Sequence, residues 1–152
     1  MQSMGAWDPS WIWGMGLAAV TTAFHAAGVV LIAQAIESIA ATYERRGLVY
    51  LDTTWGSISR IVGVAISLLF LHAIESLGWA IAYVHLKALP TFADAELYSL
   101  DSMTTRGASA LALASHWRLL GAVESANGML LFGVSTAFLF YVMQRLWKKR
   151  LT

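Results

Sequence analysis

The chain alternates long apolar runs with shorter polar segments. Three runs are long enough to cross a bilayer, at residues 11–36, 61–84 and 119–142. A helix needs about 20 mostly apolar residues to cross a hydrocarbon core of about 30 Å. Residues 14–36 carry no formal charge, and few polar side chains interrupt the other two runs. The pattern therefore predicts an all-α integral membrane protein with three transmembrane helices.

A fourth stretch, residues 92–109, is more polar and too short to cross a bilayer. It begins after Pro90 with Asp94 and Glu96, as helices often do, and continues into Thr-Thr-Arg-Gly. Irregular backbone at membrane depth is tolerated only inside protein or beside a water-filled cavity. We therefore expect a re-entrant helix and loop between the second and third spans.

Residues 37–60 separate the first two spans and mix charged with apolar side chains. Gly47 is expected to end the first helix, and the run Asp52-Thr53-Thr54 is expected to cap the next one. The segment reads as a connector at the membrane surface. Two regions follow, an N-terminal helix with its connector at 1–60 and a pore-like region at 61–152.

Composition narrows the functional classes. Of 152 residues, 58% are hydrophobic and 12% are charged, whereas soluble domains carry about 25% charged residues. A net charge of +1 gives no basis for nucleic-acid binding, and the absence of cysteine excludes disulfides and thiolate metal sites. We see no hydrolytic or nucleophilic constellation, and we predict a protein that is not an enzyme and holds no cofactor.

Basic residues predict the orientation. They are absent from the first ten residues and gather in the connector and at the C-terminus, as Arg45, Arg46, Arg60, Arg145, Lys148, Lys149 and Arg150. Cytoplasmic segments of membrane proteins are enriched in Lys and Arg. The N-terminus is therefore expected outside and the C-terminus in the cytoplasm, with the re-entrant loop entering from outside.

The polar stretch and the residues after it carry a resemblance. The residues concerned are Thr105-Arg106-Gly107-Ala108-Ser109, His116-Trp117-Arg118-Leu119-Leu120, Glu124, Leu130-Leu131-Phe132-Gly133-Val134-Ser135-Thr136-Ala137 and Gln144-Arg145-Leu146-Trp147. Residues 61–147 resemble the bacterial two-helix potassium-channel-like family. The resemblance implies a homotetramer in a bacterial inner membrane, with inorganic ions and the lipid bilayer as its partners.

In that family a pore helix leads into a filter of pattern Thr-Val-Gly-Tyr-Gly, whose backbone carbonyls replace the hydration shell of the ion. The corresponding loop here is Thr104-Thr105-Arg106-Gly107-Ala108-Ser109. Gly107 matches the first filter glycine, while Ala108 and Ser109 replace the aromatic residue and the second glycine. The resemblance therefore implies an ion channel that is not selective for potassium.

A first group of polar residues is assigned to the surroundings of this pore loop. Asp101, His72 and Glu75 are expected to form a polar network behind the loop, in which Asp101 or Glu75 pairs with Arg106, because a buried charge needs a partner. Gating by protonation of His72 is the alternative role.

Early in the third span, Glu124, Asn127 and Gly128 are expected to line the pore, as the resemblance implies. Close helix packing at the glycines is a compatible interpretation.

Two other functions stay open. One is a non-conducting scaffold or regulatory subunit with a channel-like fold. The other is a haem-binding protein, because His25 and His72 both fall near the middle of their spans and could be axial ligands. We assign no metal site, since the pair His72-x-x-Glu75 alone is a weak signal and such sites need several groups.

Overall fold

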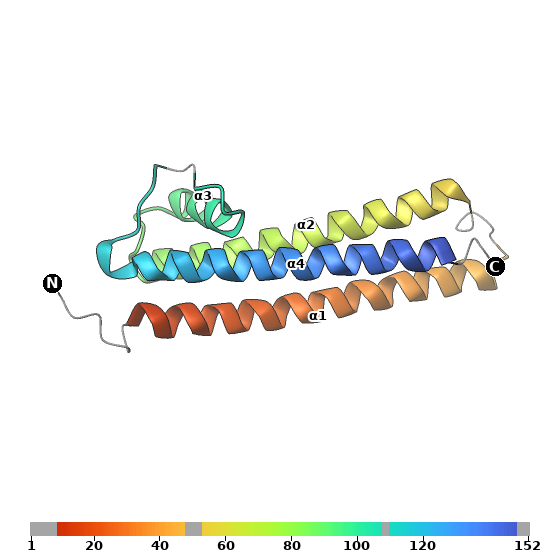
Figure 1. Ribbon diagram of the computed structural model, residues 1–152, viewed down its shortest axis with the longest axis horizontal. Helices are drawn as coiled ribbons and strands as arrows, with labels where there is room; N and C mark the ends of the chain where they lie inside the picture. Colours follow the sequence, from red (N-terminus) through yellow and green to blue (C-terminus); the bar gives the residue numbers. More distant parts are fainter. Residues whose placement is uncertain (1–8, 48–52, 108–109, 149–152) are drawn as a thin grey trace. The chain divides into compact units, whose positions relative to one another are not determined.

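The computed structural model describes residues 9–47, 53–107 and 110–148 (Figure 1). In these described ranges four α-helices follow one another: α1 (Pro9–Arg45), α2 (Thr54–His85), α3 (Phe92–Met103) and α4 (Arg118–Lys148), with a short 3₁₀ turn at Ser115–Trp117. Three segments are long and apolar enough to cross a membrane, namely Pro9–Arg45, Thr54–His85 and Ser115–Trp147. The prediction of an all-α membrane protein with three spans and a short additional helix is confirmed.

The helices extend beyond the apolar runs into the predicted connector. Residue Thr53 caps α2, because its hydroxyl accepts a hydrogen bond from the Gly56 amide at 3.0 Å. After α1, Gly47 adopts φ +65°, the left-handed conformation that often ends a helix. Both expectations are confirmed, while Asp52 lies outside the described residues.

Helix α3 begins where the sequence places the re-entrant helix. The Thr91 hydroxyl accepts a hydrogen bond from the Asp94 amide at 3.1 Å and donates one to the Asp94 carboxylate at 2.6 Å. This cap satisfies an amide that the first helical turn would leave without a partner. An acidic side chain in the first turn also stabilises the positive end of the helix dipole.

The chain forms two compact units, and each long helix contributes to both. The first comprises residues 1–25 and 72–132, and we call it the loop unit because it contains α3 and the loop after it. The second comprises residues 26–71 and 133–152, and we call it the helical unit. The predicted division at residue 60 stays a prediction.

The loop unit is built around an apolar cluster from α2, α3 and α4. Its buried members include Trp79 and Tyr83 of α2, Ala95 of α3 and Leu120 of α4. Helix α1 packs Leu17 and Ala18 against this cluster, and its fully buried residues are small or polar: Ser10, Gly14, Thr21 and His25. Small residues allow close approach of helix backbones in a membrane, and Gly14 faces the side chain of Val123.

The helical unit has an apolar core without α3. Val64 and Leu68 of α2 pack with Val142 of α4, and Val29 and Ile32 of α1 pack against them. Among its described residues, only Ser135 is a buried polar residue. This unit is therefore held by apolar packing along its helices.

Candidate functional site

Helix α3 ends in a well-defined cap that starts the filter-like loop. The Arg106 amide donates to the Asp101 carbonyl and the Thr105 amide donates to the Ser102 carbonyl, each at 3.0 Å. These two bonds form a Schellman motif, in which one residue must be left-handed, and here it is Thr105 with φ +54°. A β-branched residue in that conformation is a genuine outlier. Gly107 is also left-handed, with φ +59°.

The loop is exposed, whereas the helix before it is partly buried. Thr104, Thr105, Arg106 and Gly107 are all exposed, while Ser99, Asp101 and Met103 of α3 are buried. The other two residues of the predicted filter-like loop, Ala108 and Ser109, lie outside the described part of the chain. The described loop therefore lies at the surface of the loop unit.

Asp101 and Arg106 form the ion pair that the sequence predicts. The guanidinium Nε lies 2.5 Å from the Asp101 carboxylate. The Asp101 side chain is 2% exposed, whereas that of Arg106 is 61% exposed. One end of the pair is thus buried in α3, and the other is an exposed side chain of the loop.

Glu124 of α4 is fully buried and links three helices of the loop unit. Its two carboxylate oxygens accept hydrogen bonds at 2.5 Å, one from the Tyr83 hydroxyl of α2 and one from the Ser99 hydroxyl of α3. On α2, the Ser76 hydroxyl lies 2.9 Å from the Glu96 carboxylate of α3.

Burial raises the pKa of Tyr98, which packs edge-on against Tyr83, above its ordinary value.

The other two residues predicted to line the pore also face helices of their own chain. The Asn127 side-chain oxygen accepts a hydrogen bond from the Thr22 hydroxyl of α1 at 2.9 Å. Gly128 lies against the last turn of α3, where an added Cβ would stand 2.5 Å from the Met103 carbonyl oxygen. In a single chain, Glu124, Asn127 and Gly128 therefore hold α4 against α1, α2 and α3. Their lining of a pore stays a prediction.

Glu75 takes its partners from α1 and from its own helix. His25 Nδ1 lies 2.9 Å from one carboxylate oxygen, and His72 Nδ1 lies 3.1 Å from the other. All three side chains are buried, and their ligand atoms lie within 4.8 Å of one another. The His72 ring also stacks on Phe132 of α4, with ring centroids 4.1 Å apart. The residues expected to form one network thus lie in two separate contacts, Asp101–Arg106 and His25–Glu75–His72, and their place behind a pore loop stays a prediction.

Sequence reasoning placed His25 and His72 at similar depth but did not bring His25 to Glu75. Their rings lie 5.1 Å apart, and both Nδ1 atoms face one carboxylate. Haem ligation by these two residues stays a prediction. Sequence reasoning also missed Tyr83 and Ser99 as the partners of Glu124. The signal for them was one acid and two hydroxyl residues on three different helices.

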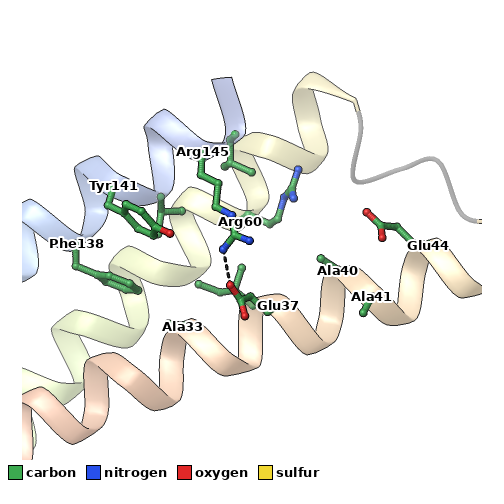
Figure 2. Close-up of a pocket in the computed structure, with 12 residues that line it drawn as sticks. Ala33, Glu37, Ala40, Ala41, Glu44, Arg60, Phe138, Tyr141 and Arg145 are labelled. Carbon is green, nitrogen blue, oxygen red and sulfur yellow. Dashed lines mark hydrogen bonds and ion pairs between the residues drawn. The ribbon is translucent and has the colours of Figure 1, made fainter. Parts of the chain in front are cut away.

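The helical unit contains a cavity of about 570 Å³, shown in Figure 2. Phe138 and the alanines of α1 give it apolar walls, and four charged residues border it: Glu37, Glu44, Arg60 and Arg145. The dashed contact joins the Arg145 guanidinium to the Glu37 carboxylate, and both of these side chains are 60% exposed. Two acidic and two basic residues thus border the cavity.

No known protein family, no curated protein and no solved structure matches the chain. The resemblance to potassium channels therefore rests on the residues quoted from the sequence.

Proposed function

We propose that four copies of this chain form an ion-conducting pore in a membrane, with one α3 and one filter-like loop contributed by each. The observation that carries the proposal is the placement of α3: a short capped helix between spans α2 and α4, ending in an exposed polar loop. Irregular polar backbone between two spans is stable beside a water-filled path. The resemblance of residues 61–147 to two-helix channels supports the same reading.

Several contacts support a rigid loop. The single hydroxyl proton of Ser99 is shared between two acceptors, the Glu124 carboxylate of α4 at 2.5 Å and the Ser76 carbonyl of α2 at 3.0 Å. The Schellman motif sets the backbone conformation at the start of the loop, and the ion pair holds Arg106 of the loop to the buried Asp101 of α3. A conduction pathway needs such preorganised backbone, because carbonyl groups must replace water around the ion without large rearrangement.

The proposed channel does not select potassium. Arginine stays protonated in proteins, so four copies of Arg106 add four fixed positive charges near the pore entrance. Pairing with Asp101 compensates each charge, and the arginine then braces the loop in place of the missing aromatic residue. We expect flux of several small ions at comparable rates.

The test is reconstitution of the purified protein in liposomes, with flux measured under gradients of potassium, sodium and chloride. Native mass spectrometry in mild detergent should give a tetramer. A potassium flux far above the sodium flux would contradict the altered filter, and only monomers or dimers would contradict the pore.

Arg106 could brace the loop or face the pore, and the variant Arg106→Ala distinguishes these two roles. Arg118→Ala is its control, because Arg118 is an exposed arginine of the same unit. If Arg106 braces the loop, Arg106→Ala and Asp101→Asn both lower the melting temperature of the tetramer, while Arg118→Ala does not. An intact tetramer with increased cation flux would instead place Arg106 in the pore.

A non-conducting scaffold is the second candidate, and it is favoured by the departure of the loop from the filter pattern at Ala108 and Ser109. It predicts a stable tetramer without flux of any tested ion, including in the Arg106→Ala variant. The same liposome series therefore decides between the two functions.

A further inference from the structure

We infer that His25, His72 and Glu75 form a binding site for one divalent transition-metal ion of the zinc type. The site lies in the loop unit, and its occupancy does not depend on conduction through the proposed pore. It is assembled from two helices, with His25 on α1 and the other two ligands one turn apart on α2. Metal sites in helix bundles are built in this way, from inward-facing side chains on neighbouring helices and an i, i+3 pair of acid and histidine.

The distances suit a single small ion. Zinc binds imidazole nitrogen and carboxylate oxygen at about 2.0–2.2 Å, so tetrahedral ligands stand about 3.3 Å apart. The Glu75 oxygens lie 2.9 Å from His25 Nδ1 and 3.1 Å from His72 Nδ1. All the ligand atoms lie within 4.8 Å of one another, so small rotations of the side chains bring them around one ion.

The charge of the cluster also favours a cation. The Glu75 side chain is 0% exposed and that of His25 is 1% exposed, in the middle of apolar helices. An ionised carboxylate in such a place requires a compensating positive charge. Two imidazoles direct the same ring atom, Nδ1, at this carboxylate. Two neutral imidazoles and one carboxylate are a common ligand set for a divalent metal.

The ligand types define the class of ion. Imidazole suits zinc, copper, iron and nickel, whereas magnesium and calcium prefer sets made of oxygen. The described cluster contains two nitrogen ligands and one carboxylate, which matches zinc or ferrous iron. Calcium and magnesium are therefore expected not to compete.

Cobalt(II) is a suitable probe because its visible absorption reports the ligands around it. The full-length protein in detergent is treated with a chelator, exchanged into metal-free buffer and titrated with Co²⁺. We expect an absorption band that saturates at one ion per chain, is displaced by Zn²⁺ and is unaffected by Mg²⁺. X-ray absorption of the bound Zn²⁺ should show nitrogen ligands at about 2.0–2.1 Å.

The four histidines of the chain supply matched variants, since His25 and His72 are buried and His85 and His116 are exposed. The double variant H85Q/H116Q should bind as the unmodified protein does. His25→Gln, His72→Gln and Glu75→Gln should each weaken binding by more than about 100-fold, because even changes behind metal ligands cost about 10- to 100-fold.

In the titrations, any one of three results would overturn the site: no saturable absorption, binding lost in H85Q/H116Q, or binding retained in His25→Gln. If the buried variants do not fold, the X-ray spectrum of the unmodified protein decides alone. A coordination shell of oxygen only would refute the proposal. Because these readouts involve no flux, failure of the metal site and failure of the channel remain distinguishable.

Discussion

The two compact units of the chain differ in whether their paired charged side chains are buried or exposed. In the loop unit, Glu75, Asp101 and Glu124 are buried, and each is bound by named side chains. In the helical unit, the ion pair of Glu37 with Arg145 is largely exposed, and the buried core is apolar.

This difference follows from the solvent. Lipid tails are as apolar as leucine, so packing apolar residues together in a membrane gains little beyond shape and contact. Buried polar groups, in contrast, have no alternative partner in hydrocarbon and hold the helices in one arrangement. The loop unit therefore specifies its structure through polar contacts, and it is the unit that we expect to carry function.

The largest expected effect is removal of the acid at the centre of the histidine cluster. Glu75→Ala deprives two buried imidazoles of their common partner, and breaking a buried pair costs about 3–5 kcal/mol. The free energy of unfolding, measured by SDS titration in mixed micelles, should fall by that amount. Glu37→Ala in the helical unit is the control. Equal losses in both variants would remove the contrast between the units.

Alanine substitutions at two glycines of α4, one in each unit, should change the stability of the protein in opposite directions. Gly128→Ala places a methyl group 2.5 Å from the Met103 carbonyl, so α3 must shift, at a cost of about 1–3 kcal/mol. Gly133→Ala in the helical unit meets no atom within 4 Å and should stabilise α4 by up to about 1 kcal/mol. Melting temperatures that move in the same direction would show that α3 does not pack on Gly128.

Loss of one buried hydroxyl is expected to have a moderate effect. Tyr83→Phe leaves one oxygen of Glu124 without its hydrogen bond, which costs about 1–3 kcal/mol at a buried site. Tyr141→Phe is the control, because Tyr141 is 54% exposed in the helical unit. If SDS titration shows no difference between the two variants, the hydroxyl of Tyr83 does not stabilise the loop unit.

The smallest effect belongs to the exposed ion pair. Exposed pairs contribute little because water and salt screen them. Arg145→Ala should leave both the melting temperature and its salt dependence unchanged within experimental scatter. A clear loss at low salt would mean that the helical unit also depends on charge, and the contrast between the units would be weaker than the structure indicates.

The sequence by itself determined the elements of this protein. The lengths of the apolar runs predicted the three spans, because the thickness of a bilayer sets how many apolar residues a crossing helix needs. Local signals predicted the ends, since Thr53 and Gly47 act within one turn of their helices. The pairing of Asp101 with Arg106 was also within reach, because five residues separate them across one helix cap.

Only the tertiary structure decided which distant polar residues meet. His25 lies 50 positions from Glu75, and Tyr83 lies 41 positions from Glu124. Helical periodicity gives the face on which a side chain lies, but not the rotation or the vertical register of one helix against another. These are fixed by packing of specific side chains, such as Gly128 against Met103. The histidine cluster and the Glu124 contacts therefore became visible only when the helices were placed together.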